Sequence, residues 1–312
     1  MTPYFSIVIP LYNKEKHISQ TLKSVINQSY NNFEVVVVND GSTDKSLEQV
    51  IKINDDRITV YSIENRGVSY ARNYGIKHAK SNLIVLLDAD DHWKSHHLED
   101  LKLLYEKFPD CGLYAKAYTK RKNGINLKSI YKNIPQENNW KGVVNNYFKS
   151  SLANSIAWTS AVMIPKTTFE KVGYFNESLN SGEDTDLWIR IALKLPVAFY
   201  NKVSAIHLLN AQNKITKTKL SSRKHIDFST YDVATNNNID LKNYINLNRI
   251  SMALQYKIEG AKNLEKDIKS HIDYNNISNL QKLLLTLPKW VIILILKCRN
   301  LIQRFIDLRI FR

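Results

Sequence analysis

Cysteine is scarce in this sequence, and long apolar runs are missing from its end. Only Cys111 and Cys298 occur among 312 residues, too few for a disulfide framework and without the spacing of a metal site, so a reducing, cytoplasmic compartment is predicted. The apolar run 290–296 is far shorter than the roughly 20 residues that cross a bilayer, so it does not predict a membrane-spanning helix. Residues 1–10 lack the features of a signal peptide, and we expect no cleaved leader.

The segment after the first apolar run also lacks the glycine-rich loop that Rossmann oxidoreductases and sugar nucleotidyltransferases have at this point. The first apolar run, residues 5–10, is followed by PLYNKEKH and not by GxGxxG. This excludes the dinucleotide-binding pattern of Rossmann oxidoreductases. The basic, glycine-rich loop that sugar nucleotidyltransferases carry at this point is missing as well.

Acidic residues are in deficit, and the deficit lies toward the end of the chain. Lys and Arg total 44 against 29 Asp and Glu, and residues 214–312 carry 18 basic against 8 acidic side chains, which is +10 of the net +15. Such an excess predicts an anionic partner, either nucleic acid, a phosphorylated substrate or an acidic membrane. The basic tail contains no nucleic-acid-binding module and has an apolar face, so we expect no nucleic acid.

The first hundred residues alternate apolar runs with segments of helical period. Strands are predicted at 5–10, 33–40, 57–63 and 82–90, each buried on both faces, and helices at 15–29, 45–54 and 68–80. This order predicts a mainly parallel, Rossmann-like sheet with helices on both faces. The polar segments PLYN, NDGS, ENRG and DADD follow the four strands, so we expect them to converge on one cleft at the carboxyl edge.

The rest of the chain predicts a completion of this domain and a helical extension. Strands near 112–119, 127–131 and 160–164 and a helix opening at 182–193 would form a second half-sheet. Helical patterns follow at 241–270 and from 278 onward. We therefore expect a catalytic or binding domain over residues 1–215 and a basic helical extension over 216–312.

The segment VLLDADDHW places three carboxylates directly after a buried strand. In an extended chain Asp88 and Asp90 would face the same side, and the two carboxylates would repel each other unless a cation lay between them. A Mg²⁺ or Mn²⁺ ion held by one or two carboxylates and by substrate phosphates fits this pattern. The alternative is that the acidic cluster caps a helix that starts near Lys94.

Other strand ends supply charged groups that match this site. Asp40 could accept hydrogen bonds from a base or sugar, and Arg72 could provide charge for phosphate or orient Asp40. In GEDTDLWIRIAL, Asp184 falls in the first turn of a predicted helix, where the helix dipole favours the ionised form that a general base needs. Capping of the helix by the same residue remains an alternative.

Five of these segments together resemble one enzyme family. PLYN, NDGSTD, ENRGVSYARNYGI, LLDADDHW and GEDTDLWIR occur in the order and approximate spacing of the family-2 inverting glycosyltransferases, whose catalytic domain has the GT-A fold. The resemblance covers about residues 5–207. Five motifs in the same order are far more specific than any one of them.

The resemblance implies a role for each matching residue. The nucleotide base would lie against the main chain around Tyr12 and Asn13 and against Asp40, and Pro10 and Arg72 are included among the substrate-binding residues. Asp88 is similar to the ribose or donor-sugar contact and Asp90 to the metal ligand of the DXD motif, with His207 as a second candidate ligand of Mn²⁺ or Mg²⁺. Glu183 would help to bind the acceptor, and Asp184 would be the general base.

The expected activity follows from these implied roles. A sugar would pass with inversion from a nucleotide sugar, commonly a UDP-sugar in this family, to a hydroxyl of a glycan or lipid-linked acceptor in cell-surface polysaccharide or lipopolysaccharide assembly. The alternative is a scaffold that binds nucleotide sugars without transfer. Residues 287–312 have a basic amphipathic pattern that could lie at the inner face of the cell membrane. Packing of this helix on the protein is the competing interpretation.

Overall fold

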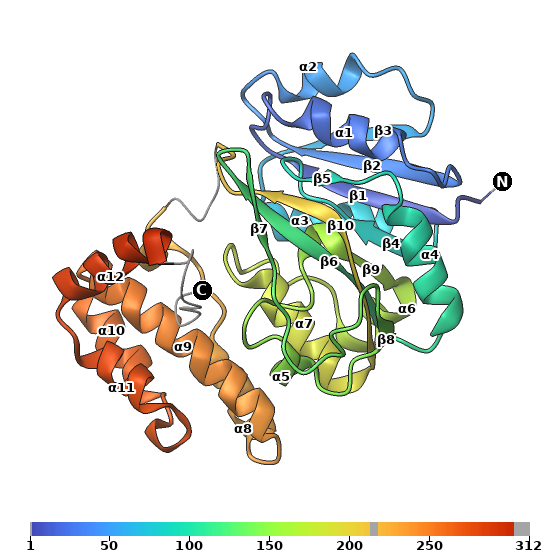
Figure 1. The fold of residues 1–312 in the computed structure, drawn as a ribbon. Coiled ribbons are helices and arrows are strands. Elements are labelled where there is room, and N and C mark those ends of the chain that lie inside the picture. The colour runs from blue at the N-terminus through green and yellow to red at the C-terminus, as the bar shows by residue number, and fades with distance from the viewer. Residues whose placement is uncertain (1, 213–217, 303–312) are drawn as a thin grey trace.

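The computed structural model describes residues 2–212 and 218–302, and it contains one large mixed sheet with helices around it (Figure 1). The sheet has ten strands, and its main path runs β3-β2-β1-β4-β9-β6-β10-β5. The strands are β1 (Phe5–Leu11), β2 (Phe33–Asp40), β3 (Ile58–Ile63), β4 (Leu83–Leu86), β5 (His92–Trp93), β6 (Leu113–Lys122), β7 (Ile125–Lys128), β8 (Lys141–Val143), β9 (Val162–Pro165) and β10 (Val197–Leu208).

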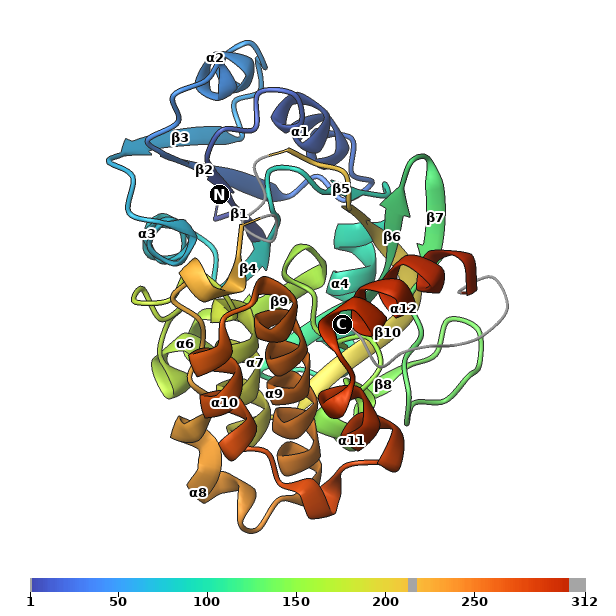
Figure 2. The same ribbon diagram turned by 90° about the vertical axis from the view of Figure 1, so that its left-hand side faces the viewer.

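The helices of the first part of the chain connect these strands. They are α1 (Ile18–Ile26), α2 (Ser46–Ile51), α3 (Val68–His78), α4 (His97–Lys107), α5 (Tyr147–Ser150), α6 (Lys166–Val172) and α7 (Glu183–Lys194). In both ribbon views α1 and α3 lie on opposite faces of the β1–β2 pair (Figures 1 and 2). Strands β3, β2, β1 and β4 are parallel, so their carboxyl ends meet at one edge.

The second half of the sheet combines parallel and antiparallel pairs. Strand β9 runs antiparallel to both β4 and β6, whereas β6 and β10 are parallel. The second half-sheet thus continues the first within one sheet, as predicted, and the α/β architecture is confirmed. The sequence pattern did not indicate the long strand β10. The end of this strand pairs with both β5 and β6.

Two expectations about the acidic strand end were wrong, and the alternative of helix capping does not apply. Strand β4 ends at Leu86 and not at residue 90, and Asp88 to Asp91 form a turn in which the Asp91 N–H donates to the Asp88 carbonyl over 3.0 Å. The alternation of an extended chain therefore does not apply to Asp88 and Asp90. The next helix starts at His97 without a side-chain cap, so the acidic cluster does not cap it.

Burial follows the position of each strand in the sheet. Strands β1, β2 and β4 are buried along nearly their whole length, which explains their continuous Val and Ile runs. Strand β3 is only partly buried, contrary to the prediction, because it forms the edge of the sheet.

The C-terminal extension is helical and packs on the domain that contains the sheet. Its helices are α8 (Asp232–Thr235), α9 (Ile239–Glu259), α10 (Lys262–Ser270), α11 (Asn279–Thr286) and α12 (Lys289–Ile302). Leu241, Tyr244, Ile245, Met252 and Tyr256 of α9 belong to the main hydrophobic core, whereas Ile250, Ala253 and Leu254 belong to a separate core with residues of α11 and α12. Across residues 2–212 and 218–302, no helix is both long and apolar enough to span a membrane. The end of the predicted amphipathic tail, residues 303–312, lies outside the described residues.

Candidate active site

The loops after β1 and β2 are tied together at the carboxyl edge of the sheet. Asn13 adopts a positive φ of 50°, and its side-chain oxygen accepts hydrogen bonds from the backbone N–H groups of Thr43 (2.8 Å) and Asp44 (3.3 Å). Pro10 pairs with Val38 in the sheet just before this loop. Tyr12 stays 44% exposed, so its ring is accessible to a ligand while Asn13 holds the loop.

Asp40 anchors the start of α3. Its two carboxylate oxygens accept the backbone N–H groups of Arg66 (2.8 Å) and Gly67 (2.9 Å), and its carbonyl accepts from the Asn65 side chain. Gly67 has a φ of 90°, which favours glycine, and it precedes the first residue of the helix. The carboxylate thus fixes the loop after β3, and each oxygen keeps a second lone pair.

Arg72 lies between two carboxylates that are far apart in the sequence. Its side chain is buried on α3, and it donates to Asp88 Oδ1 over 2.8 Å and to Glu183 Oε1 over 2.9 Å. Burial would lower the pKa of Arg72, but the charges of Asp88 and Glu183 outweigh it and raise this pKa above its usual value. The guanidinium therefore stays charged and joins the acidic turn to the start of α7.

Asp184 lies in the first turn of α7, as predicted, next to Glu183. Burial and the charge of Glu183 together, opposed by Arg72, raise the pKa of Asp184 to about 6. Oδ1 of Asp184 accepts the N–H of Thr185 over 2.6 Å, but the residue before the helix, Gly182, is the N-cap. A carboxylate that titrates near neutral pH at the edge of such a site can act as a general base.

Asp90 faces a cation from another loop. Lys14 Nζ lies 2.9 Å from Asp90 Oδ2 and also donates to the Gln212 carbonyl over 2.8 Å. Lys14 therefore links the loop after β1, the acidic turn and the segment after β10. The sequence interpretation passed over Lys14, although it directly follows Asn13 in PLYNKEKH.

Asp91, the third carboxylate of the cluster, has a structural role. Its Oδ2 accepts from Ser160 Oγ (2.7 Å) and Trp158 Nε1 (3.2 Å), and its Oδ1 accepts the N–H of Leu208 (3.1 Å). These bonds fix the acidic turn to the end of β10. His207 precedes Leu208 and stacks on Trp158 with 4.1 Å between ring centroids, which brings the imidazole to the same end of β10 as the acidic turn.

No group of three or more His, Cys, Asp and Glu side chains suited to a metal ion occurs among residues 2–212 and 218–302. Asp88 and Asp90 nevertheless offer the hard oxygen atoms that Mg²⁺ and Mn²⁺ prefer. Magnesium sites at nucleotides often use only one or two carboxylates, and substrate phosphates supply other ligands. The side chains therefore fit an ion that binds together with a diphosphate.

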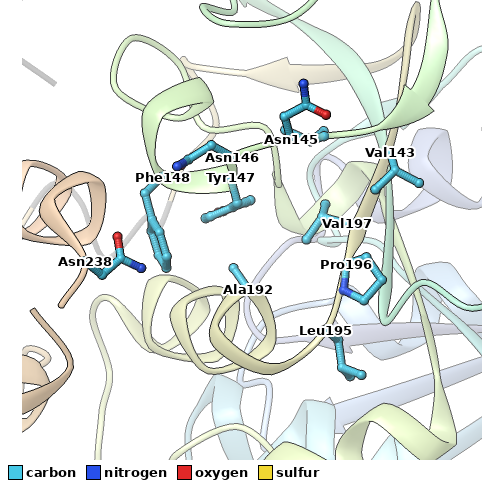
Figure 3. Close-up of a pocket in the computed structure, with 11 residues that line it drawn as sticks. Val143, Asn145, Asn146, Tyr147, Phe148, Ala192, Leu195, Pro196, Val197 and Asn238 are labelled. Carbon is cyan, nitrogen blue, oxygen red and sulfur yellow. The ribbon is translucent and has the colours of Figure 1, made fainter.

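A separate cavity of about 400 Å³ lies at the other end of α7 (Figure 3). Asn145, Asn146 and Asn238 contribute amides, and Tyr147 and Phe148 contribute rings. The helix contributes Ala192 to the cavity, whereas Asp184 lies in its first turn, so the cavity is separate from Asp184.

Comparisons with known proteins show which sequences and structures this chain is similar to. An uncharacterized glycosyltransferase of Rickettsia bellii is 32% identical over 195 residues, which are 60% of this chain and only 26% of that protein. One of Rickettsia prowazekii is 30% identical over 235 residues, 68% of this chain and 67% of that protein. Staphylococcus aureus TarS 1–349 in complex with UDP-GlcNAc has the same fold, with a TM-score of 0.58 and 22% identity over 69% of this chain and 61% of that chain. Residues 6–177 match the sequence model of Glycosyl transferase family 2, and the chain belongs to this family of glycosyltransferases.

Proposed function

We propose that this glycosyltransferase moves a sugar from a UDP-sugar to a hydroxyl of a glycan or lipid-linked acceptor, with inversion and with Mn²⁺ or Mg²⁺. One observation carries the proposal: Arg72 bonds both Asp88 and Glu183, so the acidic turn and the helix start that bears Asp184 adjoin one buried guanidinium. A direct displacement requires the nucleotide-sugar donor and the general base to lie close together.

The donor would bind along the tied loops of β1 and β2. The exposed Tyr12 ring and the main chain at Asn13 would contact the base, and Asp40 would use its remaining lone pairs toward the base or ribose. Asp88 would contact the ribose or the donor sugar. That TarS was crystallised with UDP-GlcNAc supports a UDP-sugar as the first donor to test.

Asp90 would hold the metal ion, with His207 as a further candidate ligand and the donor diphosphate completing the shell. When bound, the ion supplies Lewis acidity that stabilises the negative charge of the leaving diphosphate. Asp91 keeps the turn in place through Ser160, Trp158 and Leu208, so that Asp90 is presented to the diphosphate.

Asp184 would take the proton of the acceptor hydroxyl as its oxygen attacks the anomeric carbon. The bond from that carbon to the diphosphate oxygen breaks on the opposite face, so the product has the inverted configuration and no covalent intermediate forms. A base with a pKa of about 6 is largely ionised at neutral pH, which this step needs. Glu183, held by Arg72, would orient the acceptor.

A set of thermal-shift and transfer measurements tests the proposal. UDP with Mn²⁺ should raise the melting temperature more than GDP or dTDP with Mn²⁺, because a ligand that binds only the folded state stabilises it. Transfer from UDP-sugars to lipid-linked and free glycan acceptors is then measured directly. If none of the three nucleotides stabilises the protein, the proposed donor site is refuted. Nucleotide binding without sugar transfer or donor hydrolysis would favour the scaffold alternative.

We also propose that the enzyme contributes to cell-surface glycan assembly at the inner face of the cell membrane. Helix α12 exposes Trp290 (68%) and Leu294 (53%), and Lys289 is exposed next to them. Tryptophan with lysine is typical of helices that lie in an anionic interface. Replacement of Trp290 and Leu294 by Ser should weaken sedimentation with anionic vesicles, and unchanged sedimentation would support packing on a protein partner.

A further inference from the structure

Strands β6 and β7 form a hairpin that is closed by a two-residue turn. Lys122 pairs with Ile125 across Asn123 and Gly124, whose φ angles are 49° and 79°. Two consecutive positive φ values with Asn-Gly are typical of a type I′ turn, which matches the twist of the flanking strands. The tip therefore has a defined shape and a fixed register.

One face of this hairpin combines basic and apolar side chains. The register pairs Lys120 with Leu127 and Lys122 with Ile125, and the period of two places these four residues on the same face. Ile125 is 60% exposed and Leu127 is 39% exposed. Residues 119–136 contain five Lys and Arg and no Asp or Glu, so the segment has a concentrated positive charge.

The hairpin adjoins the candidate active site. Strand β6 pairs with β10 so that Thr119 lies opposite Ile206 and Lys120 opposite His207, and the Leu209 N–H donates to the Arg121 carbonyl. Figure 2 looks onto the carboxyl ends of β1 and β2, and in this view the hairpin lies directly above α12. Figure 1 shows the hairpin on the side of the sheet that faces the C-terminal helices.

We propose that the β6–β7 hairpin docks on an anionic lipid bilayer and presents the active site to the headgroup layer. The proposal rests on the proposed transfer to a lipid-linked acceptor and adds the surface that brings the enzyme to it. Lys122 would attract acidic headgroups, and Ile125 and Leu127 would enter the interface beside them. A soluble polyanion would use the lysines alone, because it has no apolar layer to receive Ile125.

Sedimentation of the full chain with vesicles of phosphatidylcholine and 30% phosphatidylglycerol tests this inference. We expect the wild type to bind, and Lys122→Gln and Ile125→Ser each to weaken binding several-fold. Both side chains are exposed, so the melting temperature should stay unchanged. The matched control is the double variant Ile51→Ser and Lys52→Gln on α2, where an isoleucine and a neighbouring lysine are also exposed, and it should bind like the wild type.

Binding to dextran sulfate separates lipid from a general polyanion. Lys122→Gln should weaken it, whereas Ile125→Ser should leave it unchanged. Vesicle binding by Ile125→Ser equal to that of the wild type, or no vesicle binding by the wild type, would overturn the inference. Stabilisation by UDP and Mn²⁺ is measured on the same samples, so a failure of lipid docking is distinguished from a failure of the donor site.

Discussion

Arg72 Nη1 donates to Glu183 Oε1 over 2.9 Å, across 111 residues of sequence. The same guanidinium binds Asp88, so one buried cation connects the turn that would hold the donor with the helix that carries Asp184. Planar, bidentate groups suit this task because two fixed donors can serve two carboxylates at once. The position of the acidic turn relative to Asp184 therefore depends on Arg72.

Replacement of Arg72 by Lys should lower the turnover number by roughly tenfold or more, because one ammonium cannot hold both carboxylates in the same geometry. Arg72→Gln, which removes the charge, should also move the acid side of the pH–rate profile to higher pH, because the Arg72 charge lowers the pKa of Asp184. Arg66→Lys is the control from the same motif, since Arg66 is exposed and stacks on Tyr70. An unchanged profile in Arg72→Gln would argue against the electrostatic link.

The rate should fall as the pH drops through about 6. The pKa of Asp184 is raised to about 6, mainly by burial. Only the ionised carboxylate can take the proton from the hydroxyl of the acceptor. The measurement is kcat/KM for transfer between pH 5 and 8 at saturating Mn²⁺. Asp184→Asn should lose transfer by roughly 10²–10⁴-fold and retain stabilisation by UDP. A rate that is flat from pH 5 to 8 would remove Asp184 from this role.

Asp184→Asn should make the protein more stable above pH 6. The folded-state pKa of about 6 exceeds the ordinary 3.8, so between these values the folded state holds a proton that the unfolded state has lost. Stability therefore falls as the pH rises through this window, and the ionised Asp184 costs stability above it. The gain in the free energy of unfolding at pH 8 should be about 1–3 kcal/mol and should vanish near pH 3.5.

Asp186 provides the control for this stability measurement. It lies in the same helix, accepts from Arg190 over 2.7 Å and 3.0 Å, and accepts the Tyr231 hydroxyl over 2.5 Å. Asp186→Asn should therefore destabilise the protein, since it weakens bonds to a charged partner. Destabilisation by both variants at pH 8 would show that Asp184 is also held by its surroundings.

The fold and the carboxyl-edge site could be predicted because their signals are local. Buried parallel strands require continuous apolar runs, and the polar segments after them fall at one edge by topology alone. The placement of Asp184 in a first helical turn followed from helical spacing and is confirmed. The roles assigned to the individual site residues remain proposals.

The contacts across the sheet could not be predicted, because they depend on pairs distant in the sequence. Asp91 bonds Ser160 and Leu208, and Lys14 bonds Asp90, but no spacing rule connects these positions. Strand β10 was missed since its buried first part is followed by Asn201 and Lys202, and the pairing with β6 shifts in register between Tyr200 and Ala205. Tertiary packing decides such a strand where the local pattern does not.

Lys14 and a divalent cation should compete for Asp90. Lys14 Nζ lies 2.9 Å from the carboxylate, and two cations at one carboxylate repel each other. Lys14→Gln should therefore bind Mn²⁺ several-fold more tightly in the absence of UDP, as measured by the electron paramagnetic resonance signal of free Mn²⁺. Asp90→Asn should bind it more weakly, and Lys16→Gln, at an exposed neighbouring position, should match the wild type. Equal or weaker Mn²⁺ binding by Lys14→Gln would mean that the ion does not take the place of the ammonium group. Groups other than this ion would then be the candidates for binding the diphosphate.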